Sequence, residues 1–196
     1  MAHNIEVEYR ALLSTDTYTN ILNLAKSKFS GSLRGPQKIE DAYFCRDDVK
    51  CFNEIEMNNV GSYSLRLRRD TVDNKTSATL NVKVITNKGD HNSWLEHEAT
   101  VSSFEECEKI IKILGFKIFF AYKKNRFTFT DGEIQVCLED IENFQPAIEV
   151  EIITSKEESE NAKTKLLDYL ESNGISNSSI VNKSITNMLM RERASF

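Results

Sequence analysis

The stretch NIEVEYRALL, residues 4–13, decides the fold. Apolar side chains occupy its odd positions from Ile5 to Tyr9, and charged side chains occupy the alternate positions Glu6, Glu8 and Arg10. A period of two is that of a β-strand, whose successive side chains point to opposite faces. Strands of antiparallel sheets commonly turn a charged face to water. The charged face of this strand is therefore either solvated or the lining of a polar interior.

Length and composition favour one globular domain that spans residues 1–196. Hydrophobic residues make up 40% of the chain and charged residues 28%, as in ordinary soluble proteins. No apolar run is long enough to span a membrane, and the N-terminus lacks the features of a signal peptide. We therefore expect a cytoplasmic protein without a membrane partner.

Charge and residue spacing argue against two further classes of protein. The net charge is −5 and no long basic block occurs, which disfavours general nucleic-acid binding. The four cysteines form no CxxC pair, so the sequence lacks the spacing of a zinc site. The three histidines, His3, His91 and His97, are not spaced as metal ligands either.

Further segments alternate like the first and predict about eight strands with three or four helices. The strand candidates after residues 4–13 are KIEDAYFC, SYSLRLRRD, SATLNVKVIT, SWLEHEATV, FKIFFAYKKNRFTFT, EIQVCLED and PAIEVEIIT. The segment GSLRGPQ before KIEDAYFC is expected to be a loop. Capping boxes are expected at Ser103/Glu106 and at Ser155/Glu158, each opening a helix. Short connections between strands predict a mainly antiparallel sheet in an α+β fold.

Pairs of like charges stand on one face of several predicted strands. The pairs are Glu6/Glu8, Arg66/Arg68, Glu96/Glu98, Lys124/Arg126 and Glu149/Glu151. Side chains two residues apart on a strand are about 7 Å apart, so like charges repel each other unless a counter-charge lies between them. A divalent metal supplies that counter-charge for carboxylates, and a polyphosphate supplies it for Arg and Lys.

The predicted helices indicate where these charged faces point. Each helix has an apolar stripe that needs an apolar surface to cover. If the helices cover the outside of the sheet, the charged faces turn inward and the sheet closes on itself. We therefore predict an eight-stranded antiparallel β-barrel with a charged lumen and helices packed outside. A lumen with both acids and bases can bind a metal together with its anionic ligand.

The sequence resembles the CYTH domain, or triphosphate tunnel metalloenzyme, family. The motifs that carry the resemblance occur in order along the whole chain: EVEYR, LRLR, the Lys of LNVK, LEHE, KKNR and EVE. Each motif is weak by itself, but six in series with the correct strand parity are specific. The family fold is an eight-stranded antiparallel tunnel with helices outside.

The resemblance implies a role for each charged position of the lumen. Residues implied to hold Mg²⁺ or Mn²⁺ are Glu6, Glu8, Glu139, Glu149 and Glu151, with Glu96 and Glu98 completing the acidic set. Residues implied to grip a triphosphate are Arg66, Arg68, Lys83, Lys124, Arg126 and Lys183. Catalytic roles are implied for Arg10, Lys83 and Glu98.

Four departures from the family pattern bear on activity or substrate shape, one of them the segment NFQPA in place of the family's Gly-rich link before the last strand. Arg10 replaces a Lys, and because Arg does not readily deprotonate, it cannot act as a general base. Ile185 replaces the usual Tyr near the C-terminus, which bears on substrate shape. The His-Phe pair found upstream of the first motif in one bacterial cyclase branch is absent, which disfavours adenylyl cyclase activity.

We therefore expect a divalent-metal-dependent phosphohydrolase that acts on a small triphosphate compound. Inorganic triphosphate, thiamine triphosphate and nucleoside triphosphates are all candidate substrates. The alternatives are a class IV adenylyl cyclase, which makes cyclic AMP and pyrophosphate from ATP, and another nucleotide lyase. A non-catalytic module that binds polyphosphate or nucleotide is the alternative outside the enzymes, and homodimer formation is open.

Overall fold

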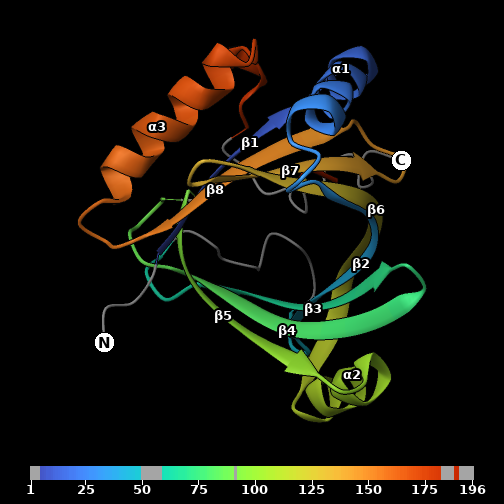
Figure 1. The fold of residues 1–196 in the computed structure, drawn as a ribbon. Coiled ribbons are helices and arrows are strands. Elements are labelled where there is room, and N and C mark those ends of the chain that lie inside the picture. Colours follow the sequence, from blue (N-terminus) through green and yellow to red (C-terminus); the bar gives the residue numbers. More distant parts are fainter. Residues whose placement is uncertain (1–4, 50–58, 91, 182–187, 190–196) are drawn as a thin grey trace.

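The fold is a closed antiparallel barrel whose strand order is β1-β5-β4-β3-β2-β6-β7-β8 (Figure 1). The computed structural model describes residues 5–49, 59–90, 92–181 and 188–189. Every neighbouring pair of strands is antiparallel. The eight-stranded α+β barrel predicted from the sequence is confirmed.

The elements follow one another in the order strand, helix, four strands, helix, three strands, helix. The strands are β1 (Ile5–Leu12), β2 (Arg34–Arg46), β3 (Tyr63–Val72), β4 (Lys75–Ile85), β5 (Ser93–Val101), β6 (Phe116–Asp131), β7 (Ile134–Ile141) and β8 (Ala147–Thr154). The helices are α1 (Thr15–Lys28), α2 (Phe104–Ile113) and α3 (Ser159–Ser172), followed by the 3₁₀ turn η2 (Asn177–Ser179).

The apolar face of β1 turns outward, beneath helices. Val7 is fully buried, and it belongs to a core cluster with Val150 of β8 and with Leu166 and Leu170 of α3. β1 is paired with β8 over its whole length and with β5 near its start, so it closes the barrel. Its charged face therefore lines the lumen, as the sequence predicted.

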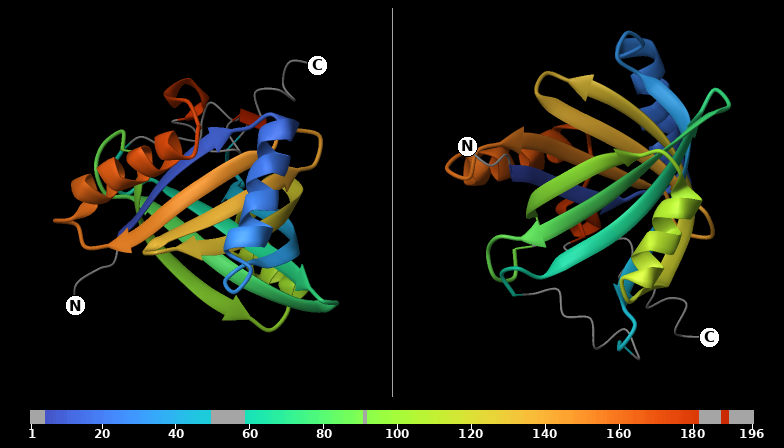
Figure 2. Two further views of the ribbon diagram at one scale, coloured as in Figure 1. Left: turned by 45° about the horizontal axis from the view of Figure 1, so that its top comes forward. Right: turned by 90° about the horizontal axis from the view of Figure 1, so that it is seen from below.

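The helices cover the outside of the barrel on two sides, as Figure 2 shows. α3 packs on β1 and β8, and α2 packs on β3 and β6. Phe29, the residue after α1, packs on Phe129 of β6, and the two ring centroids are 4.9 Å apart. No helix in the described part of the chain is long and apolar enough to cross a membrane.

Two local predictions need correction. β2 begins at Arg34, inside the segment expected to be a loop, because β6 is long enough to pair with it as far as Thr128. The ladder has an irregularity between Arg34 and Gln37, where Gly35 adopts a φ of 115° that favours glycine. The Ser155/Glu158 capping box is wrong, since Glu158 is itself the N-cap and makes no side-chain cap bond.

The Ser103 half of the other capping box is confirmed, whereas the Glu106 side chain pairs with Lys109. The Ser103 hydroxyl accepts a hydrogen bond from the Glu106 backbone N–H at 3.2 Å, at the start of α2. This bond satisfies one of the backbone donors that a helix start leaves without a partner. Cys107 and Ile111 of α2 pack on the outer face of the barrel, where α2 contacts β3 and β6.

One end of the lumen is filled by apolar side chains. These side chains lie on the lumenal faces of their strands and form one cluster with the buried Leu189. They are Leu12, Tyr43, Phe120, Tyr122, Ile141 and Ala147. The rings of Tyr43 and Tyr122 are stacked, with centroids 6.1 Å apart. The charged part of the lumen therefore lies toward the opposite end.

Candidate active site

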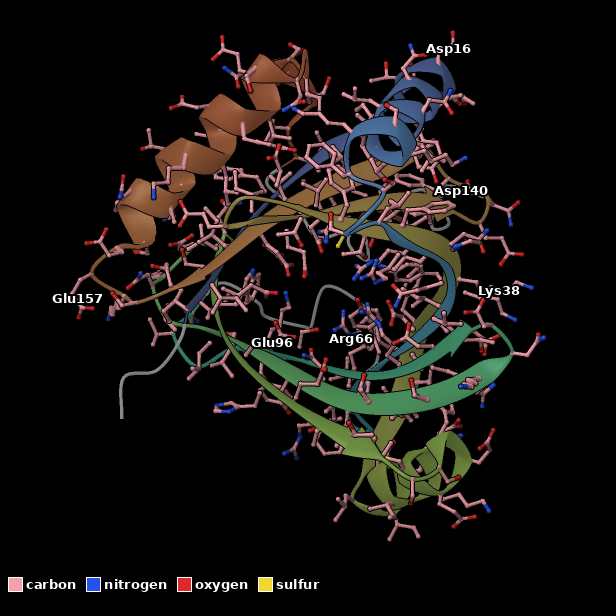
Figure 3. All side chains as sticks on the ribbon, in the orientation of Figure 1. Asp16, Lys38, Arg66, Glu96, Asp140 and Glu157 are labelled. Atoms are coloured by element: carbon pink, nitrogen blue, oxygen red, sulfur yellow. The ribbon has the colours of Figure 1, made fainter. Side chains whose placement is uncertain are left out.

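A cavity of about 430 Å³ occupies the charged part of the lumen. Its acidic lining is formed by Glu6, Glu96, Glu98, Glu149 and Glu151, and its basic lining by Arg66, Arg68, Lys83 and Arg126. Figure 3 shows Arg66 and Glu96 pointing into the barrel, whereas Lys38 and Asp140 point away from it. Residues far apart in the sequence are brought together because each occupies the lumenal face of its strand.

The lumenal side chains change character along the barrel axis. From its start, β1 presents Glu6, Glu8, Arg10 and Leu12 to the lumen in that order. The antiparallel register pairs Glu8 with Glu151 and Arg10 with Glu149. The lumen on this side thus passes from an acidic layer through a layer of acid–base pairs to the apolar end.

Three of the carboxylates predicted as metal ligands form a cluster. One oxygen atom from each of Glu6, Glu8 and Glu151 lies within 4.8 Å of the others. Glu6 and Glu8 are neighbours on the lumenal face of β1, and Glu151 is opposite Glu8 on β8. Carboxylate oxygens converging at this separation suit a hard divalent cation such as Mg²⁺ or Mn²⁺.

Lys83 of β4 lies against this cluster. Its Nζ donates a hydrogen bond to Glu8 Oε2 at 2.8 Å, another to Glu6, and lies 3.5 Å from Glu96 Oε2. Burial opposes the charge on Lys83, but Glu8, Glu6 and Glu96 outweigh it and raise the Lys83 pKa above its ordinary value. Lys83 is therefore a permanent cation beside the acidic layer.

Burial, reinforced by the neighbouring carboxylates, holds a proton at Glu6. Burial raises the pKa of Glu6 to about 9; Lys83 lowers it, and Glu8 and Glu96 raise it further. Burial also disfavours the charge on Glu96, but a hydrogen bond with Glu6 and the charge of Lys83 lower the Glu96 pKa to about 2. Without a metal, Glu6 is thus the protonated partner at neutral pH, and a cation that binds here displaces its proton.

Glu139 and Glu149, also predicted as metal ligands, lie among basic side chains. Glu139 is fully buried, and its Oε1 accepts hydrogen bonds from Lys124 Nζ at 2.6 Å and Arg126 Nε at 2.9 Å. Glu149 forms an ion pair with Arg10 and lies 3.5 Å from Arg126. The structure therefore places these two carboxylates among the basic side chains deeper in the lumen, apart from the cluster of Glu6, Glu8 and Glu151.

Asp41 of β2 is a site residue that sequence reasoning missed. It is only 1% exposed, and it accepts hydrogen bonds from Arg68 Nε at 2.7 Å and Arg68 Nη2 at 2.9 Å. Arg66 Nε and Lys124 Nζ each lie 3.9 Å away. Burial opposes its charge, but Arg68 and Arg66 keep the Asp41 pKa well below its usual range. This carboxylate is thus the shared counter-charge of three basic side chains.

The sequence signal for Asp41 is its parity, because it shares the lumenal face of β2 with Tyr43. A single acid between apolar neighbours does not form the doublet of like charges by which the other lumenal residues were found. Asn81 is a second missed residue: it is buried, and its amide donates a hydrogen bond to Glu96 across the β4–β5 ladder.

The inner basic layer of the lumen is formed by Arg66, Arg68, Lys124 and Arg126, of which Lys124 is buried beside Glu139 and does not line the cavity. Burial and the nearby Arg126 lower the pKa of Lys124 to about 7, against the opposing effect of Glu139. The Lys124 ammonium also lies 5.6 Å from the centroid of the Tyr122 ring, where the apolar end begins. An anion that binds in this layer favours the charged form of Lys124, which burial disfavours.

The remaining predicted residues occupy distinct places. Arg10 is paired with Glu149, and the neighbouring carboxylates Glu8 and Glu139 outweigh burial and raise its pKa, so it stays charged. Glu98 lines the cavity and is exposed at its mouth. His97 is exposed on the outer face of β5, as expected. Lys183 and Ile185 lie outside the described residues.

Solved structures of other proteins share this fold. A protein from Pyrococcus horikoshii superposes with a TM-score of 0.78 at 19% identity, covering 95% of this chain and 99% of that chain. A protein from Vibrio parahaemolyticus gives a TM-score of 0.75 at 15% identity, with 95% and 98% covered. At these identities the likeness shows the fold alone. A search of curated proteins finds no match.

A comparison with protein-family profiles identifies the family. The profile of the CYTH domain matches residues 4–185, which is nearly the whole chain. The match includes every strand of the barrel and every charged lumenal residue described above. The chain therefore belongs to the CYTH domain family.

Proposed function

We propose that this protein is a hydrolase of triphosphate compounds that depends on Mg²⁺ or Mn²⁺. The observation that carries the proposal is the cluster of Glu6, Glu8 and Glu151, within 4.8 Å of one another, in the same lumen as a set of buried basic side chains. The CYTH family includes triphosphatases and adenylyl cyclases. An acidic cluster beside a basic layer suits a metal complex of a polyphosphate better than either ligand alone.

The donor set of the cluster fits a divalent metal. Glu6, Glu8 and Glu151 offer hard oxygen ligands, and no cysteine or histidine lies among them. When bound, Mg²⁺ or Mn²⁺ neutralises negative charge on the phosphate oxygens. Glu8 and Glu151 come from adjacent strands of the barrel, so their positions are set by the β1–β8 ladder and not by a loop.

The basic side chains bind and orient the phosphates. Phosphoryl transfer depends mainly on positioning and on neutralising charge, because the protein has little covalent chemistry to perform. Arg68 is held by Asp41, and Lys124 and Arg126 are held by Glu139, whereas Arg66 lies 3.9 Å from Asp41. Side chains held in this way lose little rotamer freedom when an anion binds, which favours both affinity and alignment.

Arg10 stabilises charge and does not move a proton. A guanidinium stays protonated at any pH at which the protein is folded, so Arg10 cannot take the proton of an attacking water. Its pairing with Glu149 places it where the acidic layer meets the basic side chains. The predicted catalytic role of Glu98, which is exposed at the mouth of the cavity, stays a prediction.

Product analysis tests the proposal. Purified protein is incubated with Mg²⁺ or Mn²⁺ and, separately, with inorganic triphosphate, ATP and thiamine triphosphate, and the products are separated by ion-exchange chromatography. The proposal predicts orthophosphate together with the matching diphosphate. Cyclic AMP with pyrophosphate from ATP would instead identify a cyclase. Tight binding of all three compounds without turnover would identify a binding module.

A further inference from the structure

The lumen is accessible from one end within the described part of the chain. Its inner end is packed with Leu12, Tyr122, Ile141 and Ala147 around Leu189, which is 1% exposed. None of these side chains lines the cavity, so the cavity stops short of them. A ligand that fills the cavity therefore enters and leaves past the other end.

The charged layers give the bound ligand a direction. Lys124, Arg126 and the Asp41-bound Arg68 lie on the inner side, and the cluster of Glu6, Glu8 and Glu151 is nearer the mouth on β1 and β8. The terminal phosphate of a triphosphate ester carries more negative charge than either of the other two, so it is attracted most strongly to the inner basic layer. An organic group on the other end finds no space beyond that layer and remains at the mouth.

One apolar side chain stands at this mouth. Ile153 is 65% exposed and continues the lumenal face of β8 beyond Glu149 and Glu151. It lies opposite Glu6 in the β1–β8 ladder, and it lines the cavity whose other lining residues are charged or, in Gln135, an amide. A ligand whose organic group reaches this rim buries apolar surface against the isoleucine side chain.

We propose that the site takes organic triphosphates end-on, with the terminal phosphate in the inner basic layer and the organic group against Ile153 at the mouth. The inference rests on the proposed function and deepens it, because it names the substrate class and the residue that selects it. Inorganic triphosphate occupies the same layers but has nothing to place on Ile153. Ile153 is thus a specificity-determining residue rather than part of the metal or phosphate site.

The test compares substrates within one variant. For wild type and Ile153→Ser, kcat/KM is measured for ATP, for thiamine triphosphate and for inorganic triphosphate at fixed Mg²⁺. We expect the ratio of an organic substrate to inorganic triphosphate to fall about tenfold in Ile153→Ser, as the loss of one apolar contact predicts. Ile153→Leu, which keeps the apolar surface, should restore the ratio.

Ile113→Ser supplies the matched control. Ile113 is also an isoleucine and is 84% exposed, but it lies on α2 outside the barrel, so its loss should leave the ratio unchanged. An unchanged ratio in Ile153→Ser for both organic substrates would overturn the inference. If wild type hydrolyses none of the three compounds, the proposed function fails by itself. The ratio of dissociation constants for ATP and inorganic triphosphate, measured by titration calorimetry, then decides the inference.

Discussion

The acidic layer near the mouth and the basic layer deeper in the lumen are built from the same residue types in opposite proportions. Near the mouth, Glu6, Glu8 and Glu96 surround one cation, Lys83, and Glu96 also lies 3.9 Å from Arg66. Deeper in, the three carboxylates Asp41, Glu139 and Glu149 face five cations: Arg10, Arg66, Arg68, Lys124 and Arg126. A surplus of carboxylates favours the binding of a metal cation, and a surplus of basic side chains favours the binding of an anion. A carboxylate therefore has a role that depends on its depth in the lumen.

Removal of the inner counter-charge should have the largest effect. Asp41→Asn leaves Arg68 buried without its bidentate partner, and breaking a buried ion pair in this way costs about 3–5 kcal/mol. We expect the free energy of unfolding in urea to fall by that amount. Asp140→Asn, a change of the same type on the exposed face of β7, serves as the control. A loss below about 1 kcal/mol in Asp41→Asn would show that the inner pairs are not the support described here.

The two layers should differ in metal affinity. Glu151→Gln removes a carboxylate from the cluster of three and should weaken Mn²⁺ binding about 100-fold, as followed by electron paramagnetic resonance of free Mn²⁺. Glu139→Gln, in the basic layer, should weaken it much less, because Oε1 of Glu139 already serves Lys124 and Arg126. Circular dichroism melts confirm that both variants are folded. Equal losses of Mn²⁺ affinity in the two variants would show that the two layers do not differ in metal binding.

Metal binding near the mouth should release a proton. With the pKa of Glu6 at about 9 in the metal-free protein, Glu6 is protonated at pH 7 and must lose its proton to become a ligand. Mg²⁺ affinity should therefore rise with pH, by up to about tenfold per unit, until the pH passes that pKa. Calorimetry in buffers of different ionisation enthalpy should find about one proton released at pH 7 and none at pH 10. A Mg²⁺ affinity that does not change with pH across this range would contradict the presence of a proton on Glu6 in the metal-free protein.

Anion binding in the inner layer should have the opposite proton linkage and a smaller effect. Lys124, with its pKa lowered to about 7, is mostly neutral at pH 8 in the empty site. Inorganic triphosphate favours the charged form, so binding in EDTA should take up a fraction of a proton at pH 8 and little at pH 6. Lys124→Met should remove this uptake. The same proton balance in wild type and in Lys124→Met would show that Lys124 is already charged.

Strand alternation was sufficient to predict the barrel and which faces line it. Side-chain period two in NIEVEYRALL, SLRLRR and AIEVEI depends only on local sequence, and the helices required an apolar outer surface. Depth along the lumen depends instead on the register between strands, which alternation does not encode. Glu139 and Glu151 share the lumenal parity and the residue type, yet the β6–β7 register puts Glu139 beside Arg126.

Asp41 shows a second limit of the sequence pattern. It lies where the lumen changes from charged to apolar, so its lumenal neighbour on β2 is Tyr43, which belongs to the apolar end. A strand with apolar residues on both faces looks like one buried in an ordinary core, and a single acid in it carries no signal. Only the pairing of β2 with β3 and β6 brings Asp41 to Arg68 and Lys124.

The most direct test of the metal-dependent triphosphatase is orthophosphate release from inorganic triphosphate by wild type and Glu151→Gln, each assayed with Mg²⁺ and with EDTA. The predicted result is release by wild type with Mg²⁺ alone and none by Glu151→Gln, while this variant still binds inorganic triphosphate in EDTA through its intact basic layer. Full turnover by Glu151→Gln with Mg²⁺, or turnover by wild type in EDTA, would contradict the account.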